Sequence, residues 1–352
     1  MFVYRENKCF EQKKVFKPTN SHKMKRLIIV TFLAGLFSIM TEAQQVKHCY
    51  QTVDHMIWVV EQLDEVVESW EKLGFTDIDY LERVELKLDG RNIDIKAASA
   101  NLSGSKILWL QPVRDRSLLT DFLESYGSGI YAIIYGANSK SDLKEEIERL
   151  KKRRVDVNCE FELKSSDKAV SYCIMKTRDG GTYNMGFAQT NESEKLFDGL
   201  AGENKFDLQF SQYAFATSQP KEVSKYWSRI GLPKMDITHN PVHDKEYYGN
   251  PAEFDMELGW QRHGDIVYEW CIPLKSPNVY EDHIREKGEG VHHLGFQVNN
   301  MNQTLNHLTE KGFVLSQSGG WGDKGKSGSG KFAYIDPKPL GGVAVELLWS
   351  QK

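Results

Sequence analysis

An internal repeat constrains this 352-residue chain more than any other feature of its sequence. Three blocks recur in its two halves: Leu108–Val113 and Glu269–Leu274, Gly127–Ala132 and Gly288–His293, and Gly180–Met185 and Gly341–Glu346. The intervals between the blocks are the same in both halves, which chance alignment rarely produces. The chain therefore contains two copies of one domain.

Each copy divides again into a strand, a helix and about three further strands. Val53–Val60 has the composition of a strand, and Leu63–Leu73 places apolar residues at helical spacing before Gly74. A strand and a helix also recur from Ile130, Gln212 and His293. The sequence therefore predicts an α+β fold class with four βαβββ modules, which form two domains at residues 47–190 and 203–350 with a linker at about 190–205.

The N-terminal region has the pattern of a secretory signal at residues 24–43. A charged start, Met24–Arg26, precedes the apolar stretch Leu27–Met40 and an exit of small residues that ends at Ala43. Because the apolar stretch is short for a membrane span, we expect cleavage after Ala43 and an exported periplasmic or extracellular protein. An uncleaved anchor is the alternative. Residues 1–23 are polar and precede an internal methionine, so we interpret them as an over-extended start.

The charge balance argues against nucleic-acid binding. The chain has 45 Lys and Arg against 49 Asp and Glu, for a formal net charge of −4, and its longest basic run is Lys151–Arg154. We expect a small-molecule substrate as partner and no membrane contact beyond the signal segment. The sequence is also compatible with an oligomer. The cysteines form no CxxC pair, so isolated buried thiols are expected at Cys49, Cys159, Cys173 and Cys271, and a disulfide between Cys159 and Cys173 is the alternative.

Four polar residues stand in otherwise apolar strands of the second domain: Gln212, Glu269, His293 and Glu346. A bare carboxylate in a buried strand costs several kcal/mol unless it is paired or bound to a metal. Two carboxylates neutralise a divalent cation, and an imidazole and an amide oxygen complete the ligand set. The sequence therefore predicts a site for Zn, Ni, Co or Mn. The alternative is that Gln212 and Glu346 are exposed edge-strand residues and His293 is a hydrogen-bonded core histidine.

The first domain offers an internal control for this metal site. The repeat matches the four residues to His55, Leu108, Ala132 and Met185, of which only His55 could bind a metal. We therefore expect the first domain to be a degenerate copy without an ion. His292 is adjacent to His293, so it should face away from the pocket unless the strand bulges, and we expect it to pack behind the site.

Two segments could contact a substrate. The polar and aromatic segment His239–Tyr248 either contacts the substrate or is a solvated loop, and the glycine-rich run around Trp321 forms either a lid or a plain turn. This run lacks the lysine-containing signature of a phosphate loop.

The repeat and its motifs resemble the vicinal oxygen chelate superfamily, which includes glyoxalases, bleomycin-resistance proteins, methylmalonyl-CoA epimerase and extradiol dioxygenases. The segments that carry the resemblance are Ser276–Phe296 and Gly341–Leu347. The resemblance implies that paired modules curl into half-open barrels, the glyoxalase-like domains. It also implies that Gln212, Glu269, His293 and Glu346 each supply one metal ligand from a different strand.

The resemblance also implies an enzyme. Extradiol dioxygenases hold ferrous iron with two histidines and one carboxylate, whereas Gln212 occupies the first histidine's position here. The set is similar to that of lactoylglutathione lyase, which implies an isomerase, epimerase or lyase that removes a proton beside a metal-chelated carbonyl. Glu346 is the expected base and Glu269 the alternative. Because glutathione and CoA compounds are chiefly cytosolic, an exported enzyme should act on another hydroxy-carbonyl compound.

Two other functions compete with this interpretation. Relatives of the fold sequester small molecules without turning them over, although a sequestering protein does not need a complete metal set. An extradiol-type dioxygenase is the other alternative.

Overall fold

The structure is a computed structural model in which residues 47–114 and 116–351 are described. The expected leader at 1–23 and the signal at 24–43 lie outside these residues. In this part of the chain no helix is both long enough and apolar enough to cross a membrane.

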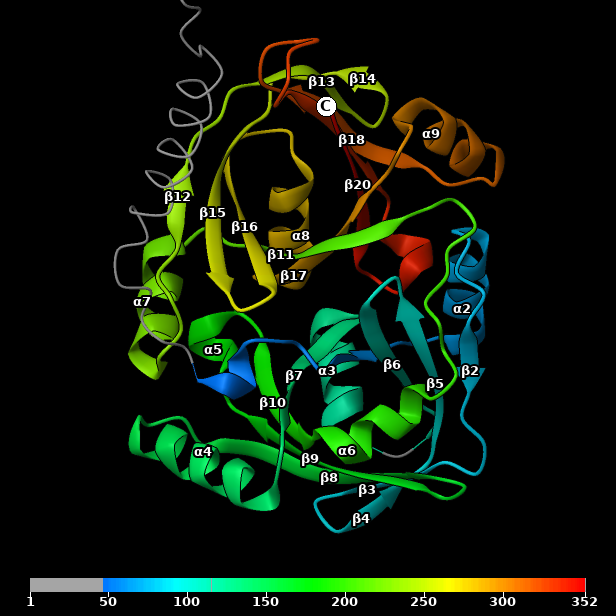
Figure 1. Cartoon of the computed structure of the whole chain (residues 1–352), viewed down its shortest axis with the longest axis vertical. Helices are drawn as coiled ribbons and strands as arrows, with labels where there is room; N and C mark the ends of the chain where they lie inside the picture. Colours follow the sequence, from blue (N-terminus) through cyan, green and yellow to red (C-terminus); the bar gives the residue numbers. More distant parts are fainter. Residues whose placement is uncertain (1–46, 115, 352) are drawn as a thin grey trace, which may run out of the picture. The chain divides into compact units, whose positions relative to one another are not determined.

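Two ten-stranded sheets form the framework of the described chain (Figure 1). The strands of the first are β1 (His55–Val59), β2 (Ile78–Tyr80), β3 (Glu85–Leu88), β4 (Arg91–Ile93), β5 (Ile95–Leu102), β6 (Ser105–Pro112), β7 (Gly129–Ala137), β8 (Val157–Ser165), β9 (Lys168–Met175) and β10 (Asn184–Gln189). Those of the second are β11 (Gln209–Ala216), β12 (Asp236–Thr238), β13 (Val242–Tyr247), β14 (Asn250–Pro251), β15 (Asp255–His263), β16 (Ile266–Lys275), β17 (Gly290–Gln297), β18 (Leu315–Trp321), β19 (Gly330–Ile335) and β20 (Ala344–Ser350).

The strand order is the same in both sheets. The first runs β2-β5-β6-β1-β7-β10-β9-β8-β3-β4 and the second runs β12-β15-β16-β11-β17-β20-β19-β18-β13-β14. In each, two modules meet at an antiparallel central pair, β1 with β7 and β11 with β17. The expected α+β class and the two glyoxalase-like domains are confirmed.

The helices follow the strands in the same repeating order. They are α2 (Leu63–Lys72), α3 (Leu118–Tyr126), α4 (Lys140–Lys152), α5 (Arg178–Gly181), α6 (Thr190–Ser193), α7 (Pro220–Ile230), α8 (Val279–Lys287) and α9 (Met301–Glu310), with short 3₁₀ turns η1 (His48–Tyr50), η2 (Glu194–Phe197) and η3 (Lys338–Leu340). In α7, Val223, Trp227 and Ile230 are buried at helical spacing, and Gly231 ends the helix at φ +107°.

The modules are more elaborate than a helix followed by three strands. In the first and third modules five strands follow the helix, because a hairpin, β3–β4 or β13–β14, crosses to the far edge of its sheet and pairs with β8 or β18. A further helix, α3 or α8, lies between the two modules of each domain. Ser117 and Asn278 cap these helices, since each side chain accepts a hydrogen bond from a backbone N–H of the first turn.

The inner faces of the two sheets differ in how they are filled. In the first domain, apolar side chains from β1, β6, β7 and β9 pack together with Leu119 and Phe122 of α3. The segment expected as a linker forms α6 and η2, and Phe197 of η2 packs into this same core. In the second domain the equivalent apolar cluster is smaller, and a cavity adjoins it. The first domain is thus filled where the second is hollow.

Reciprocal contacts join the two domains. Trp58 Nε1 of the first donates to the Gly341 carbonyl of the second at 2.7 Å, and Trp227 Nε1 of the second donates to the Gly181 carbonyl of the first at 3.1 Å. Each indole therefore binds the turn before the partner domain's last strand. A large apolar core continues across this contact.

Candidate metal centre and active site

Four neighbouring strands of the second sheet bring the four expected site residues together. Gln212 lies on β11, Glu269 on β16, His293 on β17 and Glu346 on β20, and these strands are consecutive in the order β16-β11-β17-β20. Ala214 of β11 pairs with both Glu269 and His293. This register puts the four side chains on one face of the sheet. The alternative in which Gln212 and Glu346 are exposed edge-strand residues is wrong, because both lie on central strands and both are buried.

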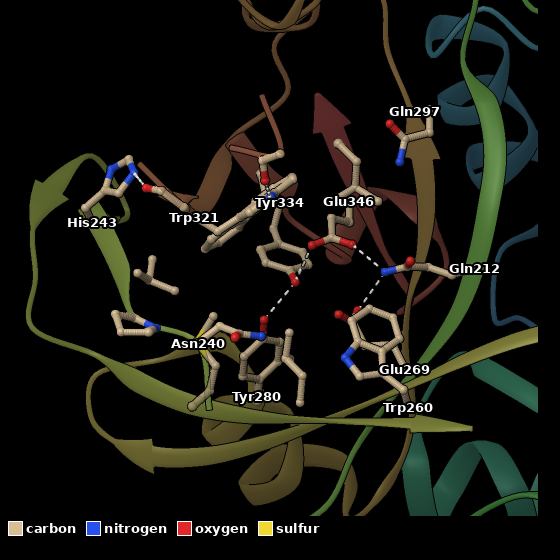
Figure 2. Close-up of a pocket in the computed structure, with 18 of the residues that line it drawn as sticks. Gln212, Asn240, His243, Trp260, Glu269, Tyr280, Gln297, Trp321, Tyr334 and Glu346 are labelled. Carbon is tan, nitrogen blue, oxygen red and sulfur yellow. Dashed lines mark hydrogen bonds between the residues drawn. The ribbon is translucent and has the colours of Figure 1, made fainter. Parts of the chain in front are cut away.

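The polar atoms of Gln212, Glu269 and Glu346 converge on one point (Figure 2), and His293 contacts the same two carboxylates. Gln212 Nε2 donates to Glu269 Oε2 at 2.8 Å and to Glu346 Oε2 at 3.2 Å. His293 Nε2 lies 3.2 Å from Glu269 Oε2 and 3.1 Å from Glu346 Oε2. A half-turn of the Gln212 amide would direct its oxygen inward instead. The site can therefore present three oxygen ligands and one imidazole nitrogen.

Burial makes the charges of this cluster strongly interdependent. Glu269, His293 and Glu346 are at most 4 % exposed. Burial and the neighbouring charge of Glu346 raise the pKa of Glu269. Burial lowers the pKa of His293, but the two carboxylates outweigh it and raise the value to about 9. An imidazolium thus supplies the positive charge that two buried carboxylates require, and a divalent cation bound by the same atoms would supply more. The residues present fit a metal of this kind.

Gly295 makes room for this convergence. It pairs with Gln212 on one side and with Glu346 on the other. A Cβ at this position would lie 2.7 Å from Gln212 Cγ, a distance that real Cβ atoms do not show. The absence of a side chain at Gly295 therefore allows the Gln212 side chain to cross the strand toward Glu346.

A strand bulge places His292 behind the site. Ala214 pairs with His293 and the next residue, Phe215, pairs with Val291, so His292 is the extra residue. Its Nδ1 lies 2.8 Å from Nδ1 of His293. The expectation that His292 packs behind the site agrees with this geometry. The bulge lets two adjacent histidines touch, which regular alternation forbids.

Three further residues at the site were not identified from sequence. Tyr334 donates its hydroxyl hydrogen bond to Glu346 Oε1 at 2.7 Å, and the Tyr334 and Tyr280 hydroxyl oxygens are 2.7 Å apart. Cys271 lies two residues beyond Glu269 on the same face of β16, and its sulfur is within 4.8 Å of a Glu269 oxygen and a His293 nitrogen. Burial raises the pKa of the Cys271 thiol well above its ordinary value. The period-2 spacing from Glu269 was the signal that could have indicated Cys271.

A cavity of about 730 Å³ opens over Glu269, Glu346 and Gln212. Its walls come from the β12–β13 segment, from β15, from β16, from α8 and from β18–β20, and the residues labelled in Figure 2 include Asn240, His243, Trp260, Tyr280 and Trp321. The segment His239–Tyr248 is therefore in part a strand of the sheet, and Asn240–His243 lines the cavity. Trp321, at the end of β18, lines it from the glycine-rich run.

The first domain has no equivalent cluster among its described residues. His55 occupies the position of Gln212, but its Nδ1 is hydrogen-bonded to Asp54 at 2.6 Å. Leu108 and Ala132 lie in the apolar core. The match of Met185 with Glu346 is wrong by one residue: Glu346 pairs with Gly295, and the equivalent Ile134 pairs with Gly186. Gly186 has no side chain, so the first domain still lacks a ligand set.

Comparison with known proteins finds a family model that matches part of the second domain. Residues 211–334 match the model of the Glyoxalase/Bleomycin resistance protein/Dioxygenase superfamily. The uncharacterized protein YqjC of Bacillus subtilis (strain 168) is 27% identical over 95 residues, which cover 27% of this chain and 66% of that protein. The match thus spans slightly less than two thirds of the relative's length.

Two solved structures have a similar fold at low sequence identity. A variant of 4-hydroxymandelate synthase from Streptomyces coelicolor superposes with a TM-score of 0.56 and 12% identity, and the alignment covers 85% of this chain and 92% of that one. A fusion of a xylose isomerase-like TIM barrel with 4-hydroxyphenylpyruvate dioxygenase gives a TM-score of 0.52 and 13% identity, over 92% of this chain and 53% of that one. At these identities the likeness shows the fold alone.

Proposed function

We propose that this chain, whose residues 211–334 match the model of the glyoxalase, bleomycin resistance protein and dioxygenase superfamily, is a metal-dependent isomerase, epimerase or lyase of the glyoxalase type. The observation that carries the proposal is the convergence of Gln212, Glu269, His293 and Glu346, of which all but His293 line a cavity. These residues would hold one divalent cation. When bound, the cation would polarise a substrate carbonyl and stabilise the oxyanion that forms there.

A carboxylate of the site would move the proton. Glu346 and Glu269 both line the cavity, and either oxygen pair can accept a proton from the carbon next to the carbonyl. The carbon–hydrogen bond breaks, its electron pair moves toward the carbonyl oxygen, and an enediolate forms. In an isomerisation the neighbouring carbon then takes a proton from the carboxyl group, whose proton can exchange with solvent, and the substrate's hydroxyl proton passes to the former carbonyl oxygen. In an epimerisation the first carbon takes a proton on its opposite face from a different donor.

We favour Glu346 as the base because of its hydrogen bonds. Tyr334 holds Oε1 of this carboxylate, and the hydroxyl of Tyr280 continues the chain along the cavity wall. This chain orients the carboxylate and offers a path for proton return. No such hydroxyl contact to Glu269 occurs among the described residues.

Incorporation of solvent deuterium into hydroxy-carbonyl compounds tests the proposal. The metal-loaded protein should exchange a carbon-bound hydrogen, and Glu346→Gln should slow the exchange by roughly 10²- to 10⁴-fold while still binding metal. Glu269→Gln is the matched variant, and a larger loss there would make Glu269 the base. Absence of exchange from every compound in a broad panel would favour the sequestering function instead.

We also propose that the protein is exported, on the strength of the apolar stretch Leu27–Met40. N-terminal sequencing of the mature protein should begin at Gln44. Retention of residues 24–43 in a cytosolic product would contradict export.

A further inference from the structure

The cavity over the metal site carries acidic groups and no lysine or arginine among the described residues that line it. Its carboxylates are Glu269, Glu346 and Asp323. A divalent cation would balance the first two, and the third is already paired with Lys326 at 2.8 Å. Among the described residues, therefore, no lysine or arginine of the lining neutralises a phosphate or carboxylate on a substrate.

The cations near this cavity are engaged elsewhere. Lys324 pairs with Asp244 at 2.7 Å. His243, which lines the cavity, lies 3.0 Å from Asp244 through Nδ1 and 3.1 Å from the Gly322 carbonyl through Nε2. Arg262 is not a lining residue, and its guanidinium carbon lies 5.2 Å from the ring centre of Trp260. A charged substrate would have to displace these contacts.

The walls instead offer flat apolar surfaces edged by amides. Trp260 and Trp321 are half-buried indoles on the cavity wall (Figure 2). Trp321 is held in place because its Nε1 donates to the Gly328 carbonyl at 3.2 Å. The amides of Asn240 and Gln297 lie at exposed positions of the same lining. Indole faces pack against carbon–hydrogen surfaces, and amides bind hydroxyl groups as both donors and acceptors.

We infer that the substrate is an uncharged polyhydroxylated hydroxy-ketone, of the ketose class, and that phosphorylated or carboxylated counterparts are excluded. This inference rests on the proposed function of the same site. A ketose carries a hydroxyl oxygen next to its carbonyl oxygen, so it offers two vicinal oxygens to a cation. Its remaining hydroxyls meet the amides and its carbon face meets the indoles.

Calorimetric titration of the metal-loaded protein tests the substrate class without requiring turnover. The probes are the ketohexoses D-fructose, D-tagatose, D-psicose and L-sorbose. D-fructose 6-phosphate is the charged counterpart of D-fructose. At least one neutral ketose should bind, and D-fructose should bind at least tenfold more tightly than its phosphate. Equal or tighter binding of the phosphate, or no binding by any of the four ketoses, overturns the inference.

Variants locate the binding surface. Trp321→Ala and Trp260→Ala should each weaken ketose binding roughly three- to tenfold, whereas Tyr80→Ala, at a surface aromatic of the first domain that is 46% exposed, should leave it unchanged. Unaltered binding in both tryptophan variants would contradict the inference. Deuterium exchange separates it from the proposed function: a ketose that binds without exchange contradicts the enzyme alone, and exchange confined to anionic substrates contradicts the substrate class alone.

Discussion

Glu269 and Glu346 each direct Oε2 at the same imidazole nitrogen of His293. Either carboxylate alone would be costly to bury, and together they repel each other, as the raised pKa of Glu269 indicates. A site of this kind is most stable when a cation lies between the carboxylates. Removal of any one of the four ligands should therefore lower the free energy of metal binding by more than an equal division among the four ligands would give.

We predict one divalent metal per chain, bound in the second domain alone. Glu346→Ala or His293→Ala should abolish stoichiometric binding, because each removes a ligand from an already minimal set. His55→Ala should leave binding unchanged, since His55 lies in the apolar first domain. Elemental analysis of purified protein measures both. Full metal content in the double variant Glu269→Ala, Glu346→Ala would refute the assignment.

Cys271 tests which donor atoms hold the metal. Its sulfur is near Glu269 and His293, but burial and the two carboxylates disfavour the thiolate that coordination requires. We predict that the cobalt-substituted protein shows no intense sulfur-to-cobalt absorption band and that Cys271→Ser binds cobalt as tightly as the parent. A strong band that disappears in Cys271→Ser would show instead that the Cys271 sulfur takes the place of one oxygen ligand.

The convergence of the four candidate residues could be predicted from the sequence because polar residues in apolar strands are conspicuous, although the repeat alignment was wrong by one residue at Glu346. Tyr334 and Cys271 could not be predicted in the same way. Tyrosine and cysteine are common in cores, so neither stood out from its apolar neighbours. The contact of His292 with His293 depends on a bulge, and a bulge has no clear sequence signal.

At the scale of single elements, β17 is the strand on which the site depends. Its Gly295 lies between Gln212 and Glu346 in the register and leaves room for their contact, and its bulge adjoins His293. We predict that Gly295→Ala lowers metal affinity at least tenfold while the protein stays folded, because the new Cβ would displace the Gln212 side chain. Gly129→Ala on β7 is the control, since a Cβ there has Phe122 at 3.9 Å as its nearest neighbour. Calorimetric titration with metal distinguishes the two, and equal affinities would contradict this role for Gly295.

The elements that sequence reasoning missed are those whose signals are local and short. Ser117 and Asn278 are good helix caps, but α3 and α8 were hidden between two strands that the repeat aligned without a gap. The hairpins β3–β4 and β13–β14 have few residues, and their pairing with distant strands β8 and β18 depends on the closed tertiary structure. The helices α2, α4, α7 and α9, with clear apolar periodicity, were predictable.

At the scale of the whole molecule, part-buried hydrogen bonds of one lysine link the first domain to the second. Lys287 of α8 donates to the Ser128 carbonyl of the first domain at 2.6 Å and to the Gly342 carbonyl of the second at 3.0 Å. Burial lowers the pKa of Lys287 to about 8, although the charges of Glu286 and Glu61 oppose the shift. A neutral amine still has two hydrogens for these two carbonyls.

The lowered pKa predicts a rise in stability with pH. Between pH 8 and 10.5 the folded protein has lost the Lys287 proton while the unfolded chain, with its ordinary value of 10.5, still binds it. The free energy of unfolding should therefore increase across this window by at most roughly 3 kcal/mol. Lys287→Met should lack that increment in denaturant titrations at matched pH. An identical pH profile in the variant would contradict the assignment.

The reaction class is the prediction that depends on the whole fold, because the fold decides which ligands meet at the metal site. Dioxygen activation at a facial triad uses two histidines and one carboxylate. Here the cluster has one histidine and two carboxylates, and Gln212 occupies the remaining position. Such a set can polarise a carbonyl without any change in the metal's oxidation state.

We therefore predict no dioxygen consumption by the iron-loaded protein with catechols or hydroxyphenylpyruvate, measured with an oxygen electrode. Gln212→His should restore little activity, since Glu269 would still occupy a coordination position. Robust uptake by the unmodified protein would overturn the isomerase proposal and make the extradiol class the leading function.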